Sequence, residues 1–179
     1  MEDESVSLSI EIASCTFCNA CELTCSFIKE GFFSLAHSRI QIVQVYEQGV
    51  NIPIVCVNCT DAPCIEVCPT NAIYREEQQK IVQIDADLCS GCAECVEVCP
   101  YGAVYIPPDK DVAVMCDLCG GEPACVHNCL YGAIKFESKP DAVFSALELE
   151  PSTEPIEEKQ WAIATMLAEQ VDESREVIG

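Results

Sequence analysis

One stretch decides the fold of this chain: Cys89-Ser-Gly-Cys92-Ala-Glu-Cys95-Val-Glu-Val-Cys99-Pro100. Its cysteines follow the spacing C-x2-C-x2-C-x3-C, and a proline comes directly after the last of them. Such a short loop can turn three thiolates inward, whereas the fourth cysteine lies one helical turn further along the chain. The stretch therefore predicts a ligand set for a metal-sulfur group.

The same ligand set occurs four times, because all sixteen cysteines of the 179 residues fall into four groups of four. The other three groups are Cys15, Cys18, Cys21 and Cys25; Cys56, Cys59, Cys64 and Cys68; and Cys116, Cys119, Cys125 and Cys129. Each group begins C-x2-C and ends x3-C, with two to five residues before its third cysteine. The second group keeps the Cys-Pro ending, whereas the first and fourth have Ser26 and Leu130 at that position. The chain thus contains an internal repeat.

The chemistry that needs such groups is that of iron-sulfur cubes. In bacterial two-cluster ferredoxins, the last cysteine of each C-x2-C-x2-C-x3-C-P run ligates the other cluster. Four complete groups therefore predict four 4Fe-4S clusters.

Disulfides and zinc are the alternatives. Disulfide frameworks rarely repeat this spacing, and zinc gives no reason for a third cysteine or for Cys-Pro. His37 and His127 are interpreted as surface or packing residues.

Charge and hydropathy limit the partners. Thirty acidic residues against nine basic ones give a formal charge of −21, so no nucleic acid partner is expected. No apolar run approaches the roughly 18 to 20 residues that cross a bilayer, so no transmembrane segment is expected. Without an export signal, the expected location is cytoplasmic, alone or as part of a membrane-associated complex.

The pattern of apolar residues predicts an α+β fold. Strand-like stretches lie at 7–12, 40–42, 81–84 and 133–136, and the x3 spacing in each group predicts the start of a short helix. We expect a double ferredoxin module over residues 1–137 and an acidic C-terminal extension over residues 138–179.

The extension carries a predicted helix near residues 153–172, in which Ile156, Ile163, Leu167 and Val171 share a face and Trp161 is a packing anchor. Three interpretations stay open for it: a cap packed on its own module, an arm that docks on a partner subunit, and a disordered acidic tail.

Residues 8–137 also resemble a known family. Their marks are the four cysteine groups, Pro63 and Pro123 in the widened second and fourth groups, and Met115-Cys116-Asp117-Leu118-Cys119 opening the fourth. The chain resembles the polyferredoxin-type iron-sulfur electron-transfer subunits of dimethyl sulfoxide reductase, formate dehydrogenase and tungsten-pterin oxidoreductase complexes. The resemblance implies tandem ferredoxin modules, one inserted in the other, each of the bacterial type with two 4Fe-4S clusters.

For ligation, the resemblance implies a nested pairing of the groups. The four sets would be Cys15, Cys18 and Cys21 with Cys129; Cys56, Cys59 and Cys64 with Cys99; Cys89, Cys92 and Cys95 with Cys68; and Cys116, Cys119 and Cys125 with Cys25. The sequence supports this pairing, since both inner groups carry Cys-Pro and both outer groups lack it. Sequential pairing, group one with two and three with four, stays open.

The implied function is electron transfer in an anaerobic oxidoreductase complex. The chain would relay single electrons between a catalytic subunit, carrying molybdenum or tungsten pterin, and another carrier or subunit. It is not expected to be an enzyme, because all sixteen thiolates are used and no iron corner stays open for substrate. The alternatives are a free-standing polyferredoxin and a subunit of a hydrogenase-type complex.

Overall fold

The computed structural model describes residues 6–78, 80–137, 149 and 154–176, with side chains described up to residue 171. In this part of the chain, six strands form three two-stranded antiparallel sheets. The pairs are β1 (Ser7–Ile10) with β6 (Ile134–Glu137), β2 (Ile40–Val45) with β3 (Val50–Val55), and β4 (Ile73–Arg75) with β5 (Val82–Ile84). The helices are α1 (Ala20–Glu30), α2 (Pro63–Glu66), α3 (Glu94–Val98), α4 (Ala124–His127) and α6 (Ile156–Glu176). Mixed helices and small sheets of this kind agree with the predicted α+β class.

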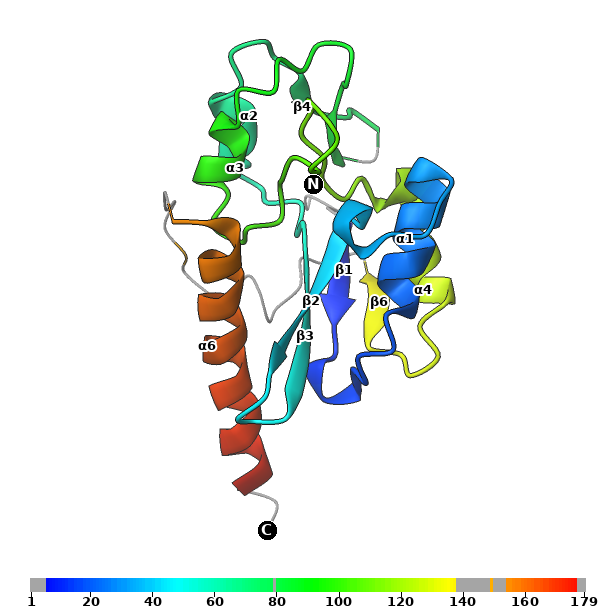
Figure 1. The fold of residues 1–179 in the computed structure, drawn as a ribbon, viewed down its shortest axis with the longest axis vertical. Coiled ribbons are helices and arrows are strands. Elements are labelled where there is room, and N and C mark those ends of the chain that lie inside the picture. Colours follow the sequence, from blue (N-terminus) through cyan, green and yellow to red (C-terminus); the bar gives the residue numbers. More distant parts are fainter. Residues whose placement is uncertain (1–5, 79, 138–148, 150–153, 177–179) are drawn as a thin grey trace.

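Segments far apart in the sequence lie side by side. The first and last cysteine groups meet because α1 packs against α4, beside the β1–β6 sheet (Figure 1). The two middle groups meet because α2 packs against α3, near the β4–β5 sheet. Each of these four helices contains the third cysteine of its group, so pairing of the helices also brings cysteines of two groups together.

The β2–β3 hairpin supplies much of the aliphatic core. It runs from the pair Ile40–Val55 to the pair Val45–Val50, and these residues are buried together with Ile52. Sequence patterning predicted the start of β2 but neither β3 nor β4. Pro53 interrupts the β3 run, and proline removes a ladder hydrogen bond, which places it at a sheet edge.

The C-terminal helix α6 lies along this hairpin (Figure 1). It begins at Ile156 and ends at Glu176, later at both ends than the predicted helix near 153–172, whose first residue lies outside the described part. Ile163, Ala164, Leu167 and Ala168 are fully or almost fully buried against β2 and β3. Trp161 is 45% exposed, so the prediction that it anchors the packing is wrong: it lies outside the buried stripe of the helix.

Candidate metal centres

The cysteines frame several separate cavities, and all sixteen of them are free thiols. The Cys129 cavity, of about 310 Å³ including its open side, is lined by Cys15, Cys18, Cys21 and Cys129. The Cys99 cavity, of about 350 Å³, is lined by Cys56, Cys59, Cys64 and Cys99. The Cys25 cavity, of about 340 Å³, is lined by Cys25, Cys116, Cys119 and Cys125. Three cavities, each lined by four sulfur atoms, suit one kind of occupant.

The remaining four cysteines form a fourth set, the Cys68 set, with Cys89, Cys92 and Cys95. Burial is the largest cause that raises the pKa of Cys95, to about 11, and the charges of Cys89, Cys92 and Cys68 raise it further. Cys68 therefore lies beside the cysteines of the third group. For three of the nested sets, the structure thus places four sulfur atoms around one cavity, and for the fourth it places Cys68 near Cys95.

A left-handed residue shapes every cysteine loop. The residue before the second cysteine of each group has a positive φ: Phe17 (56°), Asn58 (55°), Gly91 (68°) and Leu118 (51°). A left-handed residue at this position turns successive backbone N–H groups towards one point, and these groups form a concave site for an anion. Burial raises the pKa of Cys15, Cys56 and Cys116, whereas the N–H groups of Phe17, Asn58 and Leu118 lower it by donating to these sulfurs. The loops therefore fit an iron-sulfur group, which is anionic when held by four thiolates.

Burial gives a second test of fit. It raises the pKa of Cys59 to about 11, of Cys64 to about 12 and of Cys125 to about 12. Such thiols stay protonated at neutral pH unless a cation binds the thiolate. Iron ions supply that positive charge, so bound iron would explain why these thiols are clustered and buried.

The turn after the fourth cysteine is shared by three groups. The N–H groups of Asn71, Gly102 and Gly132 donate to the carbonyl oxygens of Cys68, Cys99 and Cys129, at 3.2, 3.3 and 3.2 Å. The turn at Cys129 therefore forms with Leu130 in place of proline. The first group differs, since Ser26 lies inside α1 and its Oγ donates to the Leu23 carbonyl at 3.1 Å. A proline at this position would interrupt the helix.

Electrostatic neighbours show how the four sets follow one another. Burial is the largest cause that raises the pKa of Cys21, Cys56 and Cys64, and a thiolate of another set adds to it in each case. Cys125 acts on Cys21, Cys116 acts on Cys56, and Cys95 acts on Cys64. The order is therefore the Cys129 cavity, the Cys25 cavity, the Cys99 cavity and the Cys68 set.

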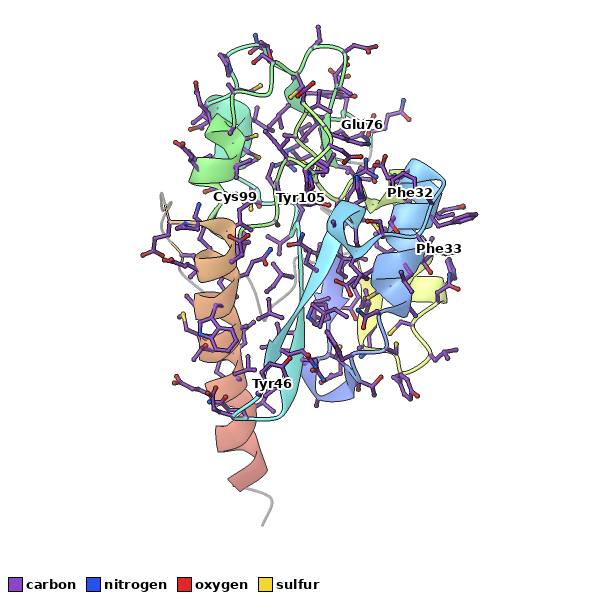
Figure 2. The ribbon with its side chains drawn as sticks, in the orientation of Figure 1. Phe32, Phe33, Tyr46, Glu76, Cys99 and Tyr105 are labelled. Atoms are coloured by element: carbon purple, nitrogen blue, oxygen red, sulfur yellow. The ribbon has the colours of Figure 1, made fainter. Side chains whose placement is uncertain are left out.

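Two basic residues that the sequence analysis did not single out hold the loops of the middle groups. Arg75 donates to the carbonyl oxygens of Cys59 and Thr60, the latter at 3.2 Å. Lys159 of α6 donates to three carbonyl oxygens at the end of α3: Val96 at 3.3 Å, Glu97 at 2.6 Å and Cys99 at 3.4 Å. Figure 2 shows Cys99 where α3 meets the start of α6. The scarcity of basic residues was the available signal for both.

Two features are absent from the described residues. No three His, Cys, Asp or Glu side chains there are grouped to hold a single metal ion, in contrast to the four-sulfur cavities. None of the described helices combines the length and the apolar character needed to cross a membrane.

Similar proteins carry the same kind of module. The chain is 40% identical over 113 residues to the polyferredoxin-like subunit of the aliphatic sulfonate oxidoreductase of Pyrococcus furiosus, covering 63% of this chain and 65% of that protein. It is 38% identical over 113 residues to the thiosulfate reductase electron transfer subunit of Salmonella typhi, covering 57% and 56%. Hydrogenase-4 component A of Escherichia coli is 35% identical over 78 residues, covering 44% and 36%. The chain thus spans less than two thirds of the length of these relatives.

The family model for the 4Fe-4S dicluster domain matches residues 48–139, which is more than half of the chain. The matched region contains the second, third and fourth cysteine groups, and the first group lies before it. This chain belongs to the 4Fe-4S dicluster domain family.

Proposed function

We propose that the chain is an electron-transfer subunit that holds four 4Fe-4S clusters and relays single electrons through them. The observation that carries the proposal is the presence of three cavities, each lined by four sulfur atoms that come from two different cysteine groups. A row of neighbouring one-electron centres connects a donor and an acceptor that are too far apart for direct transfer.

The ligand sets that we propose are the nested ones. Three cysteines of each group would hold one cluster, and its fourth ligand would come from the paired group: Cys129, Cys99, Cys68 or Cys25. The three four-sulfur cavities and the neighbours of Cys95 support this assignment. Residues 15–129 would then act as one unit, because neither group of a pair completes a site alone.

The chemistry that the clusters supply when bound is reversible one-electron transfer. The residues of the chain hold the sulfurs, exclude water and direct backbone N–H groups at the sites. Leu8, Val55 and Leu118 line or close the apolar walls of the Cys25 cavity. With all sixteen thiolates assigned, no corner is left for a substrate, so we propose that catalysis takes place in another subunit.

That partner is proposed to be a molybdenum or tungsten pterin subunit. The aliphatic sulfonate oxidoreductase and thiosulfate reductase relatives are named as parts of oxidoreductases, which supports a catalytic partner for this chain. A formal charge of −21 favours a partner with a positive docking face. The cytoplasm is the proposed location, because free thiols in this number persist in a reducing compartment.

A free-standing polyferredoxin is the second candidate. The packing of α6 on the hairpin of its own chain favours it, because that face of the helix is then not available as an arm for a partner. A hydrogenase-type complex is a further variant, supported by the similarity to hydrogenase-4 component A.

One experiment separates these candidates. The tagged chain is purified from its native cells under strict anoxia, at low and at high salt, and the fractions are analysed for iron, molybdenum, tungsten and nickel. Molybdenum or tungsten in a fixed ratio to the chain supports the pterin partner, and nickel supports the hydrogenase variant. A monomeric chain that contains iron alone at both salt concentrations would contradict the subunit proposal and favour the free carrier.

A further inference from the structure

Positive charge gathers at one of the three four-sulfur cavities. The chain has only nine lysines and arginines, yet Lys29 and Arg39 both line the Cys25 cavity, together with Asp117. In the described structure, no charged side chain lines the Cys129 cavity or the Cys99 cavity. The Cys25 cavity therefore differs from its two neighbours in charge, although its volume is nearly the same.

Arg39 is held tightly against this cavity. Its backbone N–H donates to Cys25 Sγ at 3.3 Å, and its Nη2 lies 3.5 Å from Oε1 of Glu30. The side chain is only 16% exposed, and its Nη1 is buried without a hydrogen-bond partner among the described residues. A buried guanidinium nitrogen without a partner is costly unless an anion accepts from it. A cluster in the adjacent cavity would supply that anion.

The neighbouring charges leave an excess of positive charge here. Lys29 pairs with Asp117 at 2.6 Å, and Lys110 pairs with Glu30, which also faces Arg39. Three cations thus surround two carboxylates. By contrast, the carboxylate Glu22 acts on Cys15 and Cys21, and Asp61 opposes Arg75 at Cys59.

We propose that Arg39 makes the cluster held by Cys25, Cys116, Cys119 and Cys125 the most easily reduced of the four. This inference rests on the proposed function, because it assumes that a cluster occupies that cavity. Taking up an electron makes a site more negative, and a nearby buried cation stabilises that added charge in a medium of low dielectric constant. Hydrogen bonds to the ligand sulfur, here from the Arg39 backbone, act in the same direction.

The position of this site gives the proposal a functional consequence. The Cys25 cavity is the second in the row, between the Cys129 cavity and the Cys99 cavity. One electron that leaves a donor at either end is taken up at the Cys25 site, and no proton is required. The subunit would therefore hold its first electron inside the row rather than at an end that faces a partner.

The test is a redox titration of the anoxically purified full chain, followed by electron paramagnetic resonance. Arg39→Gln keeps the backbone N–H and removes the charge, so the highest midpoint potential should fall while the other steps stay in place. Arg39→Lys should restore most of the loss. Lys135→Gln is the matched control, because Lys135 is exposed on β6 and its loss changes the net charge equally. The signal that shifts should be the one altered by Cys25→Ser.

An unchanged first reduction step in Arg39→Gln, with the iron content retained, would overturn the inference and leave the proposed function intact. A wild-type chain with far fewer than about sixteen iron atoms would instead defeat the proposed function. If Arg39→Gln loses iron, the inference is tested with Lys29→Gln instead. This variant leaves Asp117 unpaired beside the cavity and should lower the same midpoint potential. No shift in that variant would count against the inference.

Discussion

Gly91 shows how closely the cysteine loops are fitted. Its φ is 68°, and a Cβ atom built on it would lie 2.2 Å from the carbonyl oxygen of Asp111. Position 91 therefore favours glycine for two reasons, a left-handed backbone and the close approach of another segment. At the equivalent positions Phe17, Asn58 and Leu118, the chain accepts the left-handed backbone with a side chain present.

Gly91→Ala is expected to lower stability more than Gly132→Ala. Both positions have a positive φ, which costs alanine about 1–2 kcal/mol. Nothing lies within 4 Å of a Cβ on Gly132, so only Gly91→Ala adds overpacking, about 1–3 kcal/mol. Thermal unfolding of the anoxic, iron-loaded protein, followed by visible absorbance, measures the difference. Equal melting temperatures would show that Asp111 does not pack against this loop.

Glu22 is a buried carboxyl that should make stability depend on pH. Burial raises its pKa to about 7, although the Ile42 N–H donates to Oε1 at 3.1 Å, and Oε2 has no partner among the described residues. Because the folded state has the higher pKa, stability is lost as pH rises from about 4.5 to about 7 and stays low above that.

Glu22→Gln should remove this loss, which amounts to about 3 kcal/mol at most. Urea unfolding of the loaded protein at pH 5 and pH 8 measures it: the two values should differ less in the variant than in the wild type. Glu47→Gln, at an exposed position, is the control. If the pH dependence of Glu22→Gln matched that of the wild type, Glu22 would not be the titrating group.

The cysteines were predictable from the sequence, but the residues that tune the sites were not. Cysteine spacing is a local pattern, so all sixteen could be picked out and assigned to groups from the sequence. Arg39, Arg75 and Lys159 act through contacts that cysteine spacing does not indicate, such as the contact of Lys159 with the carbonyl of Cys99, 60 residues away. No periodic pattern carries that information.

Among the elements, α6 does more than pack on the β2–β3 hairpin. Lys159 is 3% exposed, and its ammonium group caps the carbonyl end of α3 next to Cys99. The last carbonyl groups of a helix have no partner within it, so a donor from another element stabilises them. Burial lowers the pKa of Lys159, whereas the charges of Cys99, Glu97 and Glu154 raise it.

Lys159→Met should therefore destabilise the end of α3 by about 1.5–3 kcal/mol, the range for hydrogen bonds to a charged group. Hydrogen exchange of the loaded protein should show faster exchange in residues 94–102 than in the wild type. Lys135→Met, at an exposed position, should change stability by less than about 0.5 kcal/mol. Unchanged exchange at α3 would mean that the cap is not formed in solution.

The strands and helices with a strong local sequence pattern were predicted correctly. The strands β1, β2, β5 and β6 lie at predicted stretches, since their apolar residues alternate or cluster. The helix α6 was predictable from its apolar stripe. The hairpin on which it packs was not, because such a stripe indicates that a face is buried but does not identify the surface that covers it. The length of α1 was also missed: it continues through Ser26 to Glu30, beyond the turn predicted between the third and fourth cysteines.

At the scale of the whole molecule, the nested pairing makes a prediction about shared clusters. Cys68→Ser and Cys95→Ser should alter the same paramagnetic signal of the reduced protein, because both sulfurs would hold one cluster. Cys64→Ser and Cys99→Ser should together alter a different one. If Cys68→Ser and Cys64→Ser affected one signal instead, each group would hold its own cluster.

The general architecture was predictable because four equal ligand sets allow few arrangements. The choice of nested over sequential pairing depended on the resemblance and on the Cys-Pro endings of the two inner groups, since cysteine spacing is the same in both pairings. The structure adds the contacts of α1 with α4 and of α2 with α3, which no local pattern in the sequence contains.

The central claim is that this chain holds four complete 4Fe-4S clusters, and the most direct test is the metal content of the anoxically purified protein. Iron, sulfide and zinc are measured together with the Mössbauer spectrum of an iron-57 sample. The account predicts about sixteen iron and sixteen sulfide per chain, in a single class of four-thiolate cubes. Zinc in place of iron, or about eight iron atoms in a fully loaded sample, would contradict it.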